Sequence, residues 1–275
     1  MLTPVDDISR AFSDAVRDAF AARSGPRFAL VLSGGPTAQE CYEVLATAEG
    51  IDWGVVDIFV GDERVVPPDD KDANQRLITE ALIDRVGGVG SFSPMPTVGP
   101  VDECVAAYQR VMADLVTGPG IDLIHLGMGP DGHTASLFPH APTLEVEPGV
   151  LVLATEDPNG VNPHPRLTLT LPAINSARLA VFTVSGASKA HAVAALVRGD
   201  DLPAARVHAG RTLWLVDGAA RADAPEIGPN ALRRRSPLHP TRRPDRAGSR
   251  RARRCARKAG HLLAQGLHSA DHALP

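Results

Sequence analysis

The sequence has little cysteine and few aromatic residues. Its three cysteines, Cys41, Cys104 and Cys255, lie far apart, and no pair has the spacing of metal ligands. An odd, scattered set argues against a disulfide framework and favours a reducing compartment, so we expect a cytoplasmic protein. Aromatic residues make up 4% of the chain, whereas 44% of its 275 residues are hydrophobic. Aliphatic residues and alanine must therefore fill the core.

Long apolar segments are also missing. No run approaches the roughly 18 residues that suggest a membrane-spanning helix. The first residues, MLTPVDDISRAF, have neither the basic region nor the apolar region of a signal peptide. We therefore predict no membrane contact.

The net charge of −4 is unevenly distributed. Residues 222–275 contain 12 of the 28 Lys and Arg but 4 of the 32 Asp and Glu, so their net charge is +8, against −12 for residues 1–221. This Arg/Pro-rich segment lacks steady periodicity, which is typical of disorder, and out-of-frame translation would also explain it. We predict a folded domain at 1–221 and a disordered or non-native tail at 222–275. The tail could bind nucleic acid nonspecifically, but no motif supports specific binding.

Apolar runs alternate with helical patterns from residue 6 to about 221. This alternation predicts an α/β fold, with a mainly parallel, doubly wound, Rossmann-like sheet and helices on both faces. Residues 166–171 alternate at period two, so we expect a half-buried strand there, and 87–100 is expected to be a loop. The expected strands are 28–32, 55–60, 121–126, 150–154, 166–171, 178–184 and 211–216, and the expected helices are 6–23, 37–48, 72–86, 101–116 and one from about 189 to 197.

The stretch 121–140 has the densest pattern. Its apolar strand is followed by three glycines and two polar residues, Gly127, Gly129, Asp131, Gly132 and His133. Glycines there let the backbone approach a ligand, and a histidine at the carboxyl edge of a parallel sheet is a candidate proton carrier. The glycines also match the dinucleotide pattern G-x-G-x-x-G. Pro139 would end the following helix after about two turns, which disfavours a nucleotide site.

Three more strand ends carry polar groups. The turn Ser33-Gly34-Gly35-Pro36-Thr37 leads into a helix, an arrangement that aims backbone N–H groups at an anion. Gly61-Asp62-Glu63-Arg64 brings three charges to the next strand end, with Asn74 close by in the following helix, and Arg64 suits a phosphate or carboxylate. Residues 185–189 form a second strand–glycine–helix junction, where Lys189 conflicts with the helix dipole unless an anion binds. We expect all these junctions to converge with 127–133 on one cleft.

Five segments together resemble the 6-phosphogluconolactonase family. They are LSGGPTA at 32–38, GDERVVPP at 61–68, GMGPDGHTASLFP at 127–139, RLTLTLPAIN at 166–175 and SGASK at 185–189. The resemblance covers roughly residues 6–220 and implies a fold of the deaminase/lactonase type. Glucosamine-6-phosphate deaminases share the SGG turn and the DGH segment, but the following TASLFP and the GDER segment favour the lactonase. Two departures are Pro36, which removes an N–H donor from the usual SGGSTP turn, and the tail, which is foreign to the family.

The resemblance implies hydrolysis of 6-phosphoglucono-1,5-lactone to 6-phosphogluconate, the second step of the oxidative pentose phosphate pathway, without cofactor or metal. His133 would be the general base, oriented by Asp131 or by an acid from Asp62-Glu63, and backbone N–H groups of residues 127–132 would stabilise the oxyanion. No G-x-S-x-G elbow is present, so direct attack by water is expected. The expected substrate-binding residues are Ser33, Gly34, Gly35, Thr37, Asp62, Arg64, Asn74, Gly129, Arg166 and Lys189.

Two other functions stay open from the sequence. One is a deaminase-like sugar-phosphate isomerase, and the other is a non-catalytic sugar-phosphate sensor. Both would bind a phosphorylated sugar at the same strand ends.

Overall fold

A computed structural model describes residues 2–158, 160 and 164–224. Seven strands form one sheet in the order β1-β10-β9-β6-β2-β3-β5, and every neighbouring pair is parallel. The predicted parallel α/β architecture is thereby confirmed. The strands are β1 (Leu2–Pro4), β2 (Phe28–Leu32), β3 (Val56–Val60), β5 (Ser91–Ser93), β6 (Leu123–Gly127), β9 (Leu179–Val184) and β10 (Arg211–Val216).

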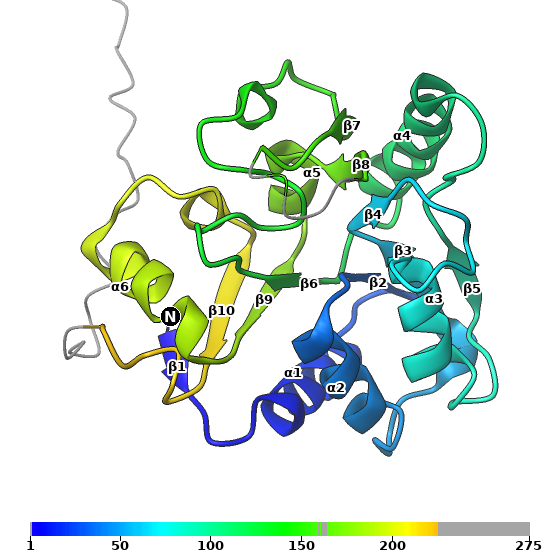
Figure 1. The fold of residues 1–275 in the computed structure, drawn as a ribbon. Coiled ribbons are helices and arrows are strands. Elements are labelled where there is room, and N and C mark those ends of the chain that lie inside the picture. Colours follow the sequence, from blue (N-terminus) through cyan, green and yellow to red (C-terminus); the bar gives the residue numbers. More distant parts are fainter. Residues whose placement is uncertain (1, 159, 161–163, 225–275) are drawn as a thin grey trace, which may run out of the picture. The chain divides into compact units, whose positions relative to one another are not determined.

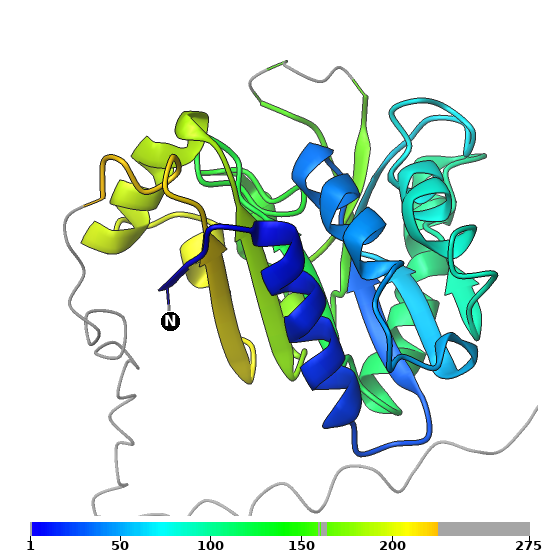
Figure 2. The ribbon, with the colours of Figure 1, turned by 90° about the horizontal axis from the view of Figure 1, so that it is seen from below.

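Helices cover both faces of this sheet (Figure 1). The first two helices lie on one face, and α4 and α5 lie on the other. In Figure 2, α1 runs alongside β9, and it contacts both β9 and β10. The helices are α1 (Ile8–Ala21), α2 (Pro36–Leu45), α3 (Asn74–Ile78), α4 (Val101–Thr117), α5 (Leu171–Asn175) and α6 (Ala190–Arg198), with short 3₁₀ turns at Trp53–Val55, Pro142–Leu144, Ala187–Lys189 and Ala204–Arg206.

Helix α1 shows how sequence sets these elements. Asp7 caps its N-terminus by accepting a hydrogen bond from the Arg10 N–H over 2.9 Å. Phe12, Val16 and Phe20 recur at helical spacing and are buried. Because a parallel sheet is covered on both faces, its central strands are continuous apolar runs, and all five residues of β2 are buried.

A second, antiparallel sheet departs from the prediction. Its order is β4-β8-β7, formed by β4 (Asp62–Arg64), β7 (Val152–Thr155) and β8 (Arg166–Leu169). The expected half-buried strand at 166–171 is wrong in this respect, because all four residues of β8 are buried. The short strands β1 and β4 were not predicted, and the loop predicted at 87–100 is wrong in part, because it contains β5.

The expected helix at 72–86 is shorter than predicted. Helix α3 begins at Asn74, and a π-helical turn, Thr79–Ile83, replaces α-helical geometry after it. Residues 134–138, where a dinucleotide site would need a helix, contain no helix but a bridge between Thr134 and Leu137. Residues 225–275 of the predicted tail lie outside the described residues, so the domain boundary at 221 stays a prediction.

The strand order reverses between β2 and β6. From β2 the chain runs to β3 and β5 on one side, and then returns to β6 on the other side of β2. Loops at such a reversal diverge and leave a crevice at the carboxyl ends of the strands. The four predicted junctions follow β2, β3, β6 and β9, which are neighbours across this point.

Candidate active site

A cavity of about 480 Å³ lies at these strand ends. Eleven of the twelve predicted site residues line it: Ser33, Gly34, Gly35, Thr37, Asp62, Arg64, Asn74, Gly129, His133, Arg166 and Lys189. The twelfth, Asp131, contacts His133. The strand order thus brings the predicted residues together, although which of them bind substrate stays a proposal.

The turn after β2 presents backbone donors. Gly35 has φ of 108° and stands at the N-cap of α2, with Pro36 at the first helical position. A missing N–H matters least there, because the first N–H groups of a helix have no intrahelical acceptor. The N–H groups of Gly34 and Gly35 have no hydrogen-bond partner among the described residues. The turn therefore keeps donors for an anion despite Pro36.

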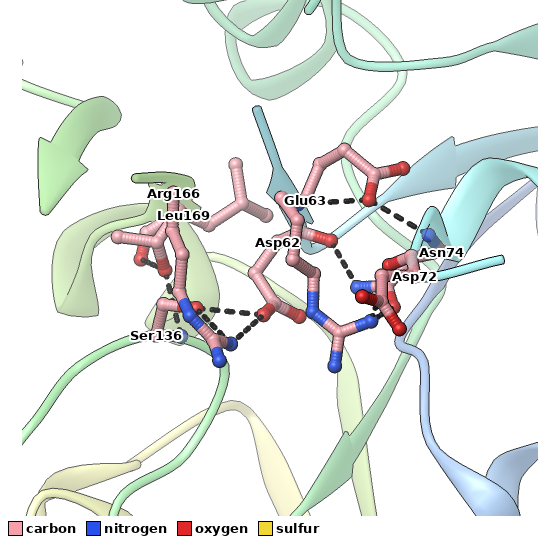
Figure 3. A network of polar contacts seen from close by, with 9 residues as sticks. Asp62, Glu63, Asp72, Asn74, Ser136, Arg166 and Leu169 are labelled. Carbon is pink, nitrogen blue, oxygen red and sulfur yellow. Dashed lines mark hydrogen bonds and ion pairs between the residues drawn. The ribbon is translucent and has the colours of Figure 1, made fainter. Parts of the chain in front are cut away.

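Arg166 faces the cavity from β8 (Figure 3). Its Nη1 lies 3.3 Å from Ser136 Oγ and 3.9 Å from Asp62 Oδ2, and the Arg166 and Asp62 side chains are 9% and 8% exposed. Ser136 donates to Asp62 Oδ2 over 2.8 Å, so one carboxylate oxygen holds both groups. Arg166 Nε is buried without a partner in the described chain. A buried guanidinium with an unused donor suits an anionic ligand.

Arg64 is held by a second part of the same network, which contains Asp72 and Asn74 (Figure 3). Its Nη1 donates to the carbonyl of Asp72 over 2.6 Å and to Asn74 Oδ1 over 3.0 Å. Asn74 in turn donates to the carbonyl of Asp62 over 2.7 Å. A Cβ at Gly34 would lie 1.8 Å from Asn74 Oδ1. Only glycine therefore fits at this position while the Asn74 carboxamide stays in place.

The prediction for Glu63 is wrong. It does not line the cleft beside its neighbours but is fully buried, and its carboxylate accepts N–H bonds from Arg64, Asn74 and Gln75 over 2.7–2.8 Å. Burial raises the pKa of Glu63 to about 7, with these three bonds acting against the rise. Glu63 therefore organises the start of α3, and it makes no bond with His133.

His133 is oriented by Asp131. The Nδ1 atom lies 2.6 Å from Asp131 Oδ1, which also accepts the His133 backbone N–H over 3.1 Å. This bond places the imidazole proton on Nδ1 and makes Nε2 the basic nitrogen. Although burial acts to raise it, the hydrogen bond and charge of His133 lower the pKa of Asp131 to about 2, so the carboxylate stays ionised. The pair has the geometry of an oriented general base.

Two N–H groups of the glycine loop before His133 are used within the loop itself. The N–H of Gly129 donates to the His133 carbonyl over 2.8 Å, and that of Gly132 donates to the Gly129 carbonyl over 3.0 Å. These two N–H groups are therefore not available to an oxyanion. A Cβ at Gly129 would lie 2.1 Å from His133 Nδ1, so glycine is required to seat the imidazole.

Lys189 also lines the cavity, from the turn before α6. Burial lowers the pKa of Lys189, while the nearby charge of Asp131 acts to raise it. The lysine is the last residue of the 3₁₀ turn before α6 and stands at the N-cap of that helix. The predicted conflict with the helix dipole is therefore present in the folded chain.

His125 and Thr183 are among the residues that line the cavity but were not predicted as site residues. His125 lies inside the apolar run of β6 and is fully buried. The sequence signal for His125 was a single polar residue in an aliphatic strand. A buried imidazole must find hydrogen-bond partners, so such a residue indicates a polar group nearby.

Comparison with known proteins identifies the family of the chain. The family model for glucosamine-6-phosphate isomerases/6-phosphogluconolactonase matches residues 4–214. The chain belongs to this family. A 6-phosphogluconolactonase from Nostoc sp. is 37% identical over 209 residues, which cover 72% of this chain and 85% of the relative.

Solved structures give the same fold. A 6-phosphogluconolactonase from Thermotoga maritima is 30% identical, with a TM-score of 0.70, covering 79% of this chain and 98% of its own. A monomeric glucosamine-6-phosphate deaminase has a TM-score of 0.68 at 19% identity, covering 81% and 98%. The second likeness shows the fold alone, so fold does not separate the two activities.

The described residues contain neither a membrane-spanning helix nor a cluster of metal ligands. Within residues 2–158, 160 and 164–224, no helix is long and apolar enough to cross a membrane. In the same ranges no group of three or more His, Cys, Asp or Glu side chains could hold a metal ion. The expectation that the enzyme needs no cofactor stays a prediction.

Proposed function

We propose that this protein hydrolyses 6-phospho-D-glucono-1,5-lactone to 6-phospho-D-gluconate. The observation that carries the proposal is the Asp131–His133 pair, 2.6 Å apart, at a cavity that also contains three cationic side chains, Arg64, Arg166 and Lys189. Such a cavity fits a phosphorylated sugar, and the pair supplies a base for ester hydrolysis. The curated relatives named 6-phosphogluconolactonase support this activity.

In this mechanism His133 Nε2 takes a proton from water as the water oxygen attacks the lactone carbonyl. Asp131 stays ionised and stabilises the imidazolium that forms. The negative charge that develops on the carbonyl oxygen lies among the cavity cations, which stabilise it electrostatically. The protonated His133 then returns its proton to the ring oxygen as the C–O bond breaks.

The dianionic phosphate binds the N–H groups of Gly34 and Gly35, with Arg64 beside them, in this proposal. Ser33, Thr37, Asn74 and Asp62 shape this half of the cavity, and Arg166 and Lys189 complete its positive lining. Such donors favour phosphate because helix N-termini and guanidinium groups both match its oxygens. A cytoplasmic location belongs to the same proposal and rests on the cysteine pattern.

The decisive experiment is hydrolysis of freshly generated 6-phosphogluconolactone above the spontaneous rate, with glucosamine-6-phosphate in parallel. His133→Ala should lower kcat about 10²- to 10⁴-fold, the usual contribution of a general base. His191→Ala is the matched control, because His191 is exposed on α6. Near-normal kcat in His133→Ala would remove His133 as the base.

The same assay separates the alternative functions. Ammonia release from glucosamine-6-phosphate, without lactone hydrolysis, would assign the protein to the deaminases. Binding of sugar phosphate without either reaction would favour the sensor.

A further inference from the structure

A buried polar cluster beneath the cavity has no part in the proposed chemistry. Its centre is His125, which no solvent reaches and which packs 4.2 Å from the ring of Phe12. Tyr42 Oη lies 2.8 Å from His125 Nδ1, and Thr183 Oγ1 lies 2.8 Å from His125 Nε2. Both His125 and Thr183 line the cavity. The cluster therefore joins α2, β6 and β9 directly below the ligand space.

The distances fix the position of each proton. Tyr42 Oη lies 2.7 Å from the carbonyl oxygen of Ser33, and two oxygens approach this closely only with a proton between them. The single hydroxyl proton of Tyr42 is then used, so the contact with His125 requires a proton on Nδ1. The backbone N–H of Ser33 donates to the same tyrosine oxygen over 3.0 Å, which completes its bonds.

The other imidazole nitrogen is consequently an acceptor. Burial lowers the pKa of His125 to about 3, so the ring is neutral and Nε2 has no proton. The Thr183 hydroxyl must therefore donate its proton to Nε2. The remaining lone pairs of the Thr183 hydroxyl can then only accept hydrogen bonds.

The position of Thr183 leaves the remaining lone pairs of its hydroxyl for a ligand. Thr183 is one of the residues that line the cavity, so these lone pairs are close to a bound ligand. Gly127, the register partner of Thr183, has no atom within 4 Å of where its Cβ would be, which leaves room beside the hydroxyl.

An acceptor at this place discriminates between ligand groups. A dianionic phosphate has acceptor oxygens only and would bring lone pair against lone pair, whereas a sugar hydroxyl offers a proton. We propose that Thr183 is a specificity-determining acceptor for a hydroxyl of the substrate's sugar, and that His125 is the positioning residue that fixes its direction. This inference rests on the proposed function and directs the phosphate away from Thr183, toward Gly34 and Gly35.

The test compares two substitutions of one residue. Thr183→Val replaces the hydroxyl by a methyl group of similar shape, and Thr183→Ser keeps the hydroxyl. For Thr183→Val we expect KM for 6-phosphogluconolactone, and Kd for 6-phosphogluconate by calorimetry, to rise about tenfold, as for one lost hydrogen bond. The kcat value and the Kd for inorganic phosphate should stay within about twofold of wild type, and Thr183→Ser should stay close to wild type throughout.

His125 is tested through its partner. His125→Leu should raise the same Kd about tenfold, and adding Thr183→Val to it should cost little more, because the two residues act as one unit. If His125→Leu does not fold, the valine and serine variants of Thr183 carry the test alone. If His125 were merely structural, His125→Leu would lower the melting temperature without changing the ratio of the Kd for 6-phosphogluconate to the Kd for inorganic phosphate.

Several outcomes overturn the inference. Unchanged binding of 6-phosphogluconate by Thr183→Val would do so, and so would an equal loss of affinity for inorganic phosphate. A wild-type protein that binds 6-phosphogluconate but does not hydrolyse the lactone would overturn the proposed function and leave this inference intact. A wild-type protein that binds neither compound would overturn both.

Discussion

The two strand–glycine–helix junctions, residues 33–37 and 185–189, look alike in sequence but offer a ligand different groups. Each has a glycine with positive φ before its helical turn, Gly35 at 108° and Gly186 at 91°. The Gly186 N–H donates to Asp217 Oδ2 over 3.0 Å, whereas the corresponding donors of the first turn have no partner in the described chain. The first junction therefore presents backbone N–H groups, and the second presents the ammonium group of Lys189.

The difference originates far from either turn. Asp217 follows β10, about 30 residues after Gly186, and it also accepts the Ser185 hydroxyl over 2.6 Å and the Ala220 N–H over 2.7 Å. A carboxylate from another strand occupies the position that an anionic ligand would take. A glycine turn before a helix is thus an anion site only where the rest of the fold leaves its donors unpaired.

The largest effect is expected from Gly34→Ala in the first junction. The new Cβ would lie 1.8 Å from Asn74 Oδ1, so it would displace the carboxamide that holds Arg64. We expect kcat/KM for the phosphorylated lactone to fall about 10²-fold, because a misplacement of about 1 Å costs that much. Gly218→Ala, which has open space at its Cβ, is the steric control. Full activity in Gly34→Ala would show that the first junction does not depend on the position of the Asn74 carboxamide.

Lys189→Ala tests what the second junction contributes. We expect KM for the phosphorylated lactone to rise about 10- to 100-fold, because a charge-assisted contact is lost, while kcat changes less. Lys189→Arg should retain most of the affinity by keeping the charge. An equal loss on unphosphorylated gluconolactone, measured under the same conditions, would show that Lys189 does not contact the phosphate.

Asp217→Asn tests the carboxylate that separates the two junctions. Burial acts to raise the Asp217 pKa, but hydrogen bonds from Ser185, Ala220 and Gly186 lower it overall. The carboxylate therefore stabilises the fold above its unfolded pKa of about 3.9, and this contribution is lost as pH falls through the folded pKa. We expect a loss of about 1 kcal/mol in the free energy of unfolding at pH 7.

Urea unfolding at pH 7 and pH 3 measures this effect. The difference between Asp217→Asn and wild type should shrink at pH 3. Asp223→Asn, an exposed carboxylate nearby, is the control and should change stability little at either pH. A difference that persists unchanged at pH 3 would mean that packing, not charge, sets the contribution of Asp217.

Truncation after Arg221 should have the smallest effect. Both junctions and Asp217 precede this point, so activity and the melting temperature should stay nearly intact. A large loss of either in a calorimetric and kinetic comparison would show that residues 222–275 support the domain.

The buried strands could be predicted from sequence because their physical signal is local. Strand β2 was predicted with its exact bounds, since Phe28–Leu32 is a continuous apolar run between turn residues. Strand β4 could not be found this way, because Asp62–Arg64 is polar and becomes a strand only by pairing with β8, about a hundred residues later. Short strands made by distant pairing have little local pattern to read.

The site shows the same division. The residue types and their convergence at strand ends follow from alternating strands and helices, so eleven predicted residues line one cavity. The direction of each side chain does not follow. Glu63 and Arg64 are neighbours in sequence, yet one is buried under α3 and the other faces the cavity. Alternation along β4 sends them to opposite sides, and that alternation depends on a strand that the sequence did not reveal.

The reversal between β2 and β6 has a consequence for folding. The chain completes β2, β3 and β5 before it returns to β6, and β2 and β6 pair through two register pairs, Leu30–Leu123 and Val31–Ile124. A bound substrate would touch Gly34 on one side of this seam and His133 on the other. Since the unfolded chain has no such site, a ligand at 100 times its Kd would add about 2.7 kcal/mol to the free energy of unfolding. Bound substrate would thus stabilise the contact between two segments that are made at different times during synthesis.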